Sequence, residues 1–377
     1  MKVLLRELQD DLYAKGITNN ELAKKWGVSS GTVSDVLNGK IQMRFCYLSK
    51  TLIILYDDRE IRRSKIRRYI STTKPRNLRE AMEYLSLRGE FDLLNRIVEK
   101  EKDSKNYENR EWAKVYKLIW KRYTNDISPT DLYKDIEKAN RNAKTLEMKI
   151  LTEILLCQVL YQNRNYRSLF DYLKDLESEI NKIKNKFIKN SFGVRYKEAL
   201  CVLLLQSGRV DEARKISVEL MNIYDNDNSF FIPMITALGK LGESYIFDDY
   251  ESAKKYLQNG IRILSTYQEK GFTTKRELFE YTLNFLKMFH WKDIDGLEEI
   301  LGEVELSFFK FRQGKYKEAE ELLLKNIGNG EVSTPFETLY LGLVRNDRNL
   351  IKKSLEQFEE LGNIFYSRLP KLYLGIL

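Results

Sequence analysis

The sequence predicts an all-α protein, and three observations support this fold class. Its 377 residues include only five prolines and nineteen glycines, so long segments are free to form helices. With 43% hydrophobic and 32% charged residues, the chain has the composition of a globular protein rather than a disordered one. From residue 77 onward, helical stretches separated by turn residues recur in pairs. The length is greater than one small core needs, which predicts more than one domain.

The positive charge is concentrated near the N-terminus. Residues 1–76 hold 16 Lys and Arg against 8 Asp and Glu, a net charge of +8, whereas residues 77–377 hold 48 against 47. A small basic domain joined to a nearly neutral larger one is typical of proteins in which only the small domain meets a polyanion. We therefore expect a nucleic-acid partner for the N-terminal part.

Residues 21–40, ELAKKWGVSSGTVSDVLNGK, have the pattern of two short helices joined by a turn. The first helix is expected over 21–26 and the second from Ser29 to Leu37, each with apolar side chains at the spacing of a buried face. The expected caps and turn residues are Asn19 or Asn20, Gly27, Ser29, Asn38 and Gly39. The expected inward-facing residues are Leu22, Ala23, Trp26, Val28, Val33, Val36 and Leu37. The pattern is that of a helix-turn-helix.

The outward side chains of the second helix are the candidates for DNA contact. The segment resembles the phage-repressor class of helix-turn-helix domains in Ala23, Gly27, Val28, Val33 and LNGK. That class implies base contacts near the start of the second helix and phosphate contacts at its end. The predicted DNA-binding residues are Ser29, Ser30, Gly31, Thr32, Ser34, Asp35, Asn38, Lys40 and Arg44. Their short side chains predict modest direct readout with a shape-dependent share, and the alternative is a helical hairpin without a nucleic-acid partner.

A second basic run, DDREIRRSKIRRYISTTKPR, spans residues 57–76. Its arginines recur at helical spacing, which fits either a solvated helix face or a second element that contacts phosphates. Lys74, Pro75 and Arg76 are expected to break the helix, and we place a domain boundary there.

Residues beyond 76 repeat a theme of paired helices. The segments that carry it are SLRGEFDLLNRI, YQNRNYRSLFDYL, LQSGRVDEARKIS, IFDDYESAKKYL and FRQGKYKEAEELL. In three of them a small residue, Ala213, Ala253 or Ala319, would let two antiparallel helices approach closely. LGKLGESY at 238–245 matches the Leu, Gly and Tyr spacing of tetratricopeptide repeats. We expect a degenerate tetratricopeptide-like α-solenoid of roughly seven to nine helical hairpins, either with a peptide groove or as a protein-binding scaffold.

The order of these two parts resembles the peptide-pheromone receptors of Gram-positive bacteria and their mobile elements, and within them the arbitrium receptors of Bacillus phages. The segments that carry the resemblance are REWAKVYKL (110–118), LEMKI (146–150), FIKNSFGVR (187–195), IFDDYESAKKYLQNGI (246–261) and RLP (368–370). The resemblance implies a cytoplasmic homodimer that binds a double-stranded DNA operator and activates a negative regulator of lysogeny. It also implies that a short secreted signal peptide ends productive DNA binding.

The positions that align with the peptide-binding residues of these receptors depart from the family pattern. Asparagine positions fall on Val202, Gln206, Glu243 and the pair Lys287–Met288, and an aspartate position falls on Asn363. The predicted peptide-binding residues are Arg195, Gln206, Glu243, Asn284, Lys287 and Asn363. Glu243 could pair with a ligand arginine or amino terminus, and Lys287 or Arg195 with its carboxylate. The cognate peptide is expected to differ from the family's, and the alternative is peptide-independent regulation.

Enzymatic and metal-binding functions are not expected. Cys46, Cys157 and Cys201 lie far apart without CxxC spacing, and His290 is the single histidine, among aromatic residues. No GxGxxG, no GxxxxGK and no Ser/His/Asp order is present. The three cysteines are expected to be buried apolar residues, and no cofactor is expected. The sequence holds neither a signal peptide nor an apolar run long enough for a membrane span, so we expect a cytoplasmic protein without a membrane partner.

The expected domains follow from these boundaries. Residues 1–70 form the helix-turn-helix domain, 71–76 a basic linker, 77–362 the solenoid with its peptide groove, and 363–377 a C-terminal helix for capping and dimerisation. The last segment, NIFYSRLPKLYLGIL, is apolar where a terminal repeat normally shows a polar face, so we expect it to be covered by a second copy. Two alternatives stay open: a bacterial pheromone-responsive regulator, and a tetratricopeptide interaction scaffold without DNA binding.

Overall fold

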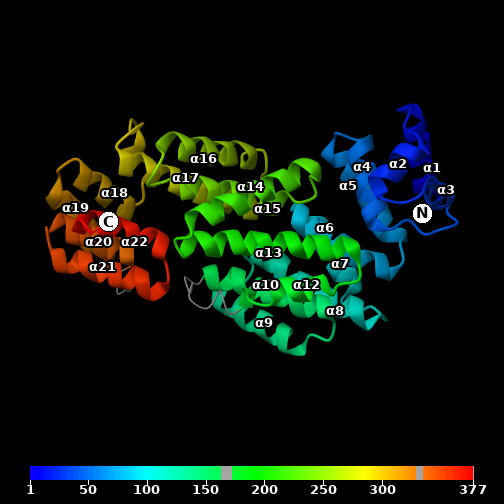
Figure 1. Cartoon of the computed structure of the whole chain (residues 1–377), viewed down its shortest axis with the longest axis horizontal. Helices are drawn as coiled ribbons and strands as arrows, with labels where there is room; N and C mark the ends of the chain where they lie inside the picture. Colours follow the sequence, from blue (N-terminus) through cyan, green and yellow to red (C-terminus); the bar gives the residue numbers. More distant parts are fainter. Residues whose placement is uncertain (163–171, 328–333, 377) are drawn as a thin grey trace. The chain divides into compact units, whose positions relative to one another are not determined.

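The structure is a computed structural model that describes residues 1–162, 172–327 and 334–376 (Figure 1). Within these ranges the chain is built from helices and turns, and none of the described residues forms a strand. The chain is all-α, with an N-terminal helix-turn-helix domain followed by a tetratricopeptide-like α-solenoid, which confirms the predicted fold class.

Two compact units divide the chain. The first unit comprises 1–127, 134–152 and 178–193, and the second comprises 128–133, 153–177 and 194–377. Helices that lie within the first unit are α1 (Lys2–Ala14), α2 (Asn19–Trp26), α3 (Ser30–Leu37), α4 (Phe45–Leu55), α5 (Arg59–Thr72), α6 (Pro75–Arg88), α7 (Phe91–Glu101) and α8 (Tyr107–Thr124). Helices with residues in both units are α9 (Pro129–Asn142), α10 (Leu146–Gln162), α12 (Leu176–Asn181) and α13 (Lys186–Gln206).

The second unit continues the series of consecutive helices to the C-terminus. Its remaining elements are α14 (Val210–Asn226), α15 (Phe231–Ser244), α16 (Tyr250–Leu264), α17 (Lys270–His290), the short η1 (Leu297–Glu299), α18 (Glu303–Arg312), α19 (Tyr316–Ile327), α20 (Pro335–Val344), α21 (Arg348–Leu361) and α22 (Ile364–Leu374). Successive helices pack on one another, as α14 does on α15, α15 on α16 and α16 on α17. Neighbour-to-neighbour packing of this kind is the defining feature of a solenoid.

The helix-turn-helix forms as predicted, except for the residue that caps its first helix. Thr18 caps α2, because its hydroxyl accepts a hydrogen bond from the Glu21 backbone N–H and the Glu21 carboxylate accepts one from the Thr18 backbone N–H. The expectation that Asn19 or Asn20 is the cap is therefore wrong, since both lie inside the helix. Gly27 ends α2 in the left-handed conformation with φ 72°, and Ser29 caps α3, as expected.

Six of the seven residues expected to face inward are buried, and the seventh, Val28, is half-buried. The Trp26 ring stacks on Tyr47 of α4 with ring centroids 4.7 Å apart, and its Nε1–H donates to the Thr51 hydroxyl at 3.1 Å. The indole thus fills the core between α2 and α4 while its polar group stays satisfied.

Helix α6 connects this N-terminal region to the first repeat. Its Glu80 is 4% exposed and accepts from the Arg44 guanidinium and, at 3.3 Å, from the Cys46 backbone N–H of α4. Glu90, just after α6, pairs with Arg59 and Arg63 of α5. These buried ion pairs hold α4 and α5 against the first repeat helices within one compact unit.

Small residues permit the close packing of repeat helices. Ala213, Ala253 and Ala319 are fully buried, as the sequence predicts. Glycines play the same part between α15, α16 and α17, where the Phe279 ring lies against Gly239 and Gly260. A methyl group built on Gly260 would lie 2.0 Å from a ring carbon of Phe279, so only glycine fits there.

The C-terminal helix α22 belongs to the core. Phe365 packs with Leu204, Leu205 and Ala213 of α13 and α14. Leu369 and Leu374 join the core formed by α17 to α21. Among the described helices, none is both long enough and apolar enough to cross a membrane.

We predict that Gly260→Ala lowers the stability of the repeats by about 1–3 kcal/mol, because the added methyl group overpacks the contact with Phe279. Gly193→Ala is the matched control, since a methyl group there meets nothing within 4 Å. Removal of glycine from that helix interior is expected to be neutral or to stabilise by about 0.5–1 kcal/mol. The midpoint of thermal unfolding measures both changes, and equal midpoints for the two variants would contradict the packing described.

Candidate functional site

The exposed face of α3 is the first candidate site. Ser30 and Gly31 are exposed at its N-terminal end, where a recognition helix meets base edges. Ser29 is occupied as the cap, because its hydroxyl accepts from the Thr32 backbone N–H at 3.2 Å and lies 3.0 Å from the Thr32 hydroxyl. The first turn of α3 is thus held in place by its own side chains.

The far end of α3 carries a small polar network. Asp35 pairs with Lys40 at 3.3 Å, and the Asn38 amide donates to the Ser34 hydroxyl at 3.2 Å. Gln9 of α1 donates to Asn38 at 3.3 Å, a contact that the sequence did not predict because the two residues are far apart in the chain. The structure therefore brings Ser34, Asp35, Asn38 and Lys40 together beside the loop after α3.

Arg44 lies apart from this network. Its guanidinium pairs with the buried Glu80 of α6, so the positive charge is already balanced inside the protein. Removal of Arg44 would leave a buried carboxylate without its cation, at a cost in stability that a DNA-binding assay would confuse with lost contact. Of the two predicted cationic contacts, Lys40 is the one whose side chain is mainly exposed.

The second basic run forms α5, and its cations are largely neutralised within the first unit. Lys65 and Arg68 donate to Glu7 of α1 at 2.8 and 2.6 Å. These hydrogen bonds lower the pKa of the Glu7 carboxyl to about 2. Arg63 is buried against Glu90. Neither a fully solvated face nor a continuous phosphate-binding row describes this helix.

A second candidate site is a polar cluster inside the second unit, which we call the interior cluster: Tyr161, Glu198, Thr236, Lys240, Glu243 and Lys275. The Thr236 hydroxyl donates to Glu198 and accepts from Lys275, both at 2.7 Å. Lys240 donates to the Tyr161 hydroxyl at 2.7 Å and pairs with Glu243. These contacts join α10, α13, α15 and α17 through charged and polar side chains.

Electrostatics keep this cluster in fixed protonation states. Burial acts to lower the pKa of Lys240, but the nearby Glu243 charge outweighs it, so the pKa is raised and the ammonium stays charged. Burial raises the pKa of Tyr161, which keeps its phenol protonated. Burial likewise raises the pKa of Cys201 beside the cluster to about 12, so its thiol is no nucleophile at neutral pH.

Two buried acceptors near this cluster have no hydrogen-bond donor among the described residues. They are the second carboxylate oxygen of Glu198 and the amide oxygen of Gln206, on side chains that are 5% and 1% exposed. Both residues lie on α13, about 12 Å apart along its axis. An unsatisfied buried acceptor costs about 1–3 kcal/mol, so a ligand that donates hydrogen bonds there would gain affinity.

Several of the predicted peptide-binding side chains already have partners within the protein. Glu243 pairs with Lys240, and the Asn363 side-chain oxygen Oδ1 caps α22 by accepting from the Tyr366 backbone N–H at 3.3 Å. Arg195 and Asn284 are buried, and Lys287 is half-buried on α17. Within the described ranges, Gln206, Asn284, Lys287 and Asn363 form no hydrogen bond with one another. Among these residues, Gln206 has a fully buried acceptor for which the described residues supply no donor.

Sequence reasoning missed Tyr161, Glu198, Thr236, Lys240 and Lys275. A usable signal exists in the α15 sequence FIPMITALGKLGES, whose only charged residues are Lys240 and Glu243, three positions apart. Opposite charges at this spacing on one face of a core helix predict a buried ion pair. The partners on α10 and α13 are too distant in the chain for spacing to reveal them.

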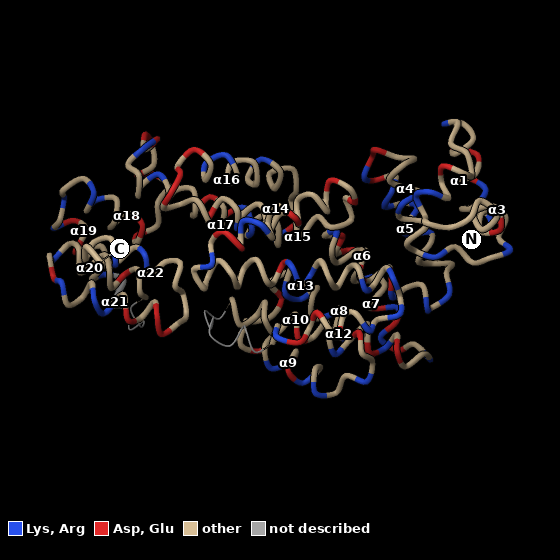
Figure 2. Tube along the Cα trace, in the orientation of Figure 1, with Lys and Arg blue, Asp and Glu red and all other residues tan. Residues whose placement is uncertain are grey.

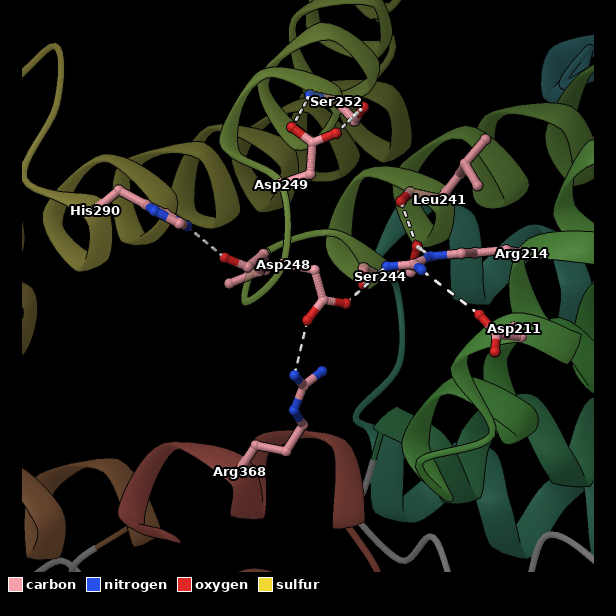
Figure 3. Close-up of polar contacts among 10 residues, drawn as sticks. Asp211, Arg214, Leu241, Ser244, Asp248, Asp249, Ser252, His290 and Arg368 are labelled. Carbon is pink, nitrogen blue, oxygen red and sulfur yellow. Dashed lines mark hydrogen bonds and ion pairs between the residues drawn. The ribbon is translucent and has the colours of Figure 1, made fainter. Parts of the chain in front are cut away.

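Two segments that carried the family resemblance meet in a third polar site (Figure 3). Asp248, in the turn after α15, accepts from Arg214 of α14 at 3.0 Å and from Arg368 of α22 at 2.8 Å. Partial burial acts to raise the pKa of Asp248, but these hydrogen bonds hold it below its usual range. Beside it, His290 Nε2 lies 2.8 Å from the Ile246 carbonyl oxygen, so the single histidine has a structural contact.

The family of the chain can be assigned by comparison with known proteins. A family model described as AimR transcriptional regulator-like matches residues 62–374. An uncharacterized protein of Bacillus anthracis, pXO2-35, is 35% identical over 238 residues, which are 63% of this chain and 87% of that protein. The AimR transcriptional regulator of Bacillus phage phi3T is 26% identical over 304 residues, or 78% of this chain and 76% of that protein.

A solved structure described as phAimR with its ligand agrees in fold. It superposes with a TM-score of 0.75 at 24% sequence identity and covers 89% of this chain and 97% of that one. At this identity the likeness extends to the fold alone, and the side chains described above are those of this chain.

Proposed function

Because the chain belongs to the AimR transcriptional regulator-like family, and is a transcription regulator on that ground, we propose that it binds a double-stranded DNA operator and that a short signal peptide controls the binding. The observation that carries the DNA-binding part is α3, a capped helix with an apolar buried face and a short polar exposed face, within a region of net charge +8. We propose 1–70 as the DNA-binding domain, 71–76 as its linker, 77–362 as the solenoid and 363–377 as the C-terminal capping and dimerisation segment.

In this proposal, Ser30 and Gly31 approach base edges and Lys40 contacts a phosphate. The ion pair with Asp35 orients Lys40, which remains largely solvated and therefore loses little on moving to a phosphate. The short side chains of α3 leave room for close approach of the backbone, so sequence preference depends in part on groove shape.

The signal peptide is proposed to bind in the second unit beside the interior cluster. The open acceptors of Glu198 and Gln206 suit the donors of a peptide, such as an arginine guanidinium or an amino terminus. We therefore propose Glu198 as the carboxylate that pairs with a ligand arginine or amino terminus. The sequence had predicted Glu243 for this contact, but Lys240 already neutralises Glu243. A peptide that differs from the family's is the preferred ligand, and regulation without a peptide is the alternative.

The biological role proposed is the choice between lysis and lysogeny, by analogy with the AimR regulators of Bacillus phages phi3T and SPbeta. Catalysis has no part in this proposal. A bacterial pheromone-responsive regulator is the second candidate, since a 35% identical relative comes from Bacillus anthracis. A short reading frame for a secreted pro-peptide beside the gene, within prophage sequence, favours the first candidate.

We propose that the regulator acts as a homodimer through its C-terminal region, because one short helix-turn-helix gains affinity when two copies bind two half-sites. On α22 and just beyond it, Ile364, Leu372 and Ile376 are exposed apolar residues. Deletion of the whole segment is no clean test, because Phe365 and Leu369 are fully buried in the core. Substitutions on the exposed side keep the core intact.

For DNA binding, we predict that Lys40→Ala weakens operator binding and reduces the slope of log affinity against log salt by about one. Its expected loss is similar for operator and unrelated duplexes, because a phosphate contact carries no sequence information. Lys255→Ala on α16 is the control, since Lys255 is exposed outside the N-terminal region. Fluorescence anisotropy at several salt concentrations measures the affinity and the salt slope of both variants. Identical titrations for the two variants would show that Lys40 does not contact DNA.

For peptide binding, we predict that Glu198→Gln lowers the affinity for the peptide encoded beside the gene by about tenfold or more, because a charged acceptor is lost. Glu277→Gln on α17, an exposed carboxylate, should leave the affinity unchanged. Isothermal titration calorimetry measures both. Unchanged affinity in Glu198→Gln would move the site elsewhere, and no heat with the wild-type protein would favour peptide-independent regulation.

For the dimer, we predict that Leu372→Glu combined with Ile376→Glu gives a monomer with lower operator affinity, because four charges would meet at the two-fold interface. Ile300→Glu, at another exposed apolar residue, should leave the dimer intact. Light scattering coupled to gel filtration distinguishes the two, and a dimer in the double variant would place the interface on another surface.

A further inference from the structure

A cleft of about 840 Å³ lies in the first unit, and α3 has no part in its lining. Helices α7, α8 and α9 line it, and all its lining residues fall between Val98 and Lys144. Tyr107, which is 53% exposed, supplies apolar surface beside the buried Val98, Val115 and Leu118, while seven lining residues are Lys or Arg and three are Asp or Glu. Figure 2 shows how basic and acidic residues mix along these helices. The cleft thus combines an apolar lining with an excess of positive charge.

Two of the three carboxylates in this cleft already have partners. Glu99 accepts from Lys102 at 2.8 Å and from Lys117 at 2.9 Å, and these hydrogen bonds lower the pKa of Glu99 to about 2. Glu111 accepts from the Lys144 backbone N–H at 2.5 Å and from the Thr145 hydroxyl at 2.7 Å, which fixes the turn between α9 and α10. These acidic groups are therefore not free to balance the other cations.

Three lysines of the cleft are left without a partner. Lys114 and Lys121 lie two turns apart on α8, and Lys138 faces the same cleft from α9. The ammonium groups of these three lysines form no ion pair or hydrogen bond with another described residue. Uncompensated cations around a concave surface raise the local concentration of anionic ligands.

We propose that this cleft binds an acidic amphipathic segment of a partner protein. Carboxylates of that segment would meet Lys114, Lys121 and Lys138, and its apolar side chains would pack on the exposed ring of Tyr107 and on the aliphatic stems of the lysines. Both features are needed, because exposed ion pairs alone contribute little and the burial of apolar surface supplies most of the affinity. The volume falls within the range of ligand pockets, about 300–1,000 Å³, which suits a few side chains of a docked helix or strand.

Nucleic acid fits the cleft less well than an acidic protein segment. Duplex DNA presents a dense, regular row of phosphates and requires evenly spaced cations on an open surface. Here Glu99 and Asp135 lie among the cations and would repel phosphates, and the apolar lining would remain uncovered. This partner site is independent of the DNA and peptide sites proposed above.

The test uses the full-length protein and a fluorescent acidic peptide of about 12 residues with Leu at i, i+3 and i+4 and Glu elsewhere. We expect saturable binding that weakens with salt, and a loss of about tenfold or more in Lys114→Glu combined with Lys138→Glu. Lys352→Glu combined with Lys353→Glu on α21 is the control, because it makes the same charge change at exposed lysines outside the cleft. Oligoglutamate of the same length should bind several-fold more weakly than the amphipathic peptide.

Three outcomes would overturn the proposal. They are no binding of the amphipathic peptide to the wild-type protein, equal losses in the cleft variant and the control variant, and oligoglutamate binding as tight as the amphipathic peptide. Operator affinity is measured in parallel by anisotropy with a labelled duplex. The cleft variant, unlike the control variant, could lose as much affinity for the operator as for the peptide. That outcome would assign the cleft to nucleic acid and would also overturn the proposal.

Discussion

Three buried carboxylates, Glu80 and Glu83 of α6 and Glu90 just after it, are the constraint on which the first unit depends. Glu80 binds Arg44 and the start of α4, and Glu83 accepts from the Tyr116 hydroxyl of α8 at 2.7 Å. Glu90 takes both Arg59 and Arg63 of α5. A buried carboxylate that loses its partner costs several kcal/mol, roughly 3–5 in measured cases, so each of these contacts matters to the stability of the first unit. They fix α4 and α5 on the first repeat, and α3 packs on that base through α2.

This arrangement changes how the basic charge of the N-terminal region is interpreted. Part of the net charge of +8 over residues 1–76 is balanced by carboxylates on α6 and α7, as with Arg44 and Arg63. The electrostatic attraction to DNA therefore comes from fewer residues, such as Lys40, than composition indicates. We therefore propose that groove shape and the joint binding of two copies contribute to recognition beside charge.

The sequence predicted what local chemistry determines and missed what the tertiary fold determines. Gly27 and Ser29 set the turn and the second cap through their own backbone preferences, so reading them needed only neighbours in the chain. Lys240 and Tyr161, by contrast, are separated by 79 residues, and no periodicity links them. The same is true of Asp248 and Arg368, although both segments stood out by resemblance. The predicted peptide-binding residues stay a prediction, and the intramolecular partners of Glu243 and Asn363 could not be read from the sequence.

We propose that a peptide bound in the repeats changes DNA binding by α3, and the coupling factor between the two ligands measures this change. The full-length protein is titrated onto operator DNA with and without a saturating amount of the peptide encoded beside the gene. We expect the peptide to change the operator affinity by about 5- to 150-fold, which corresponds to a coupling free energy of roughly 1 to 3 kcal/mol. Equal affinities, with peptide binding verified in the same sample, would contradict it.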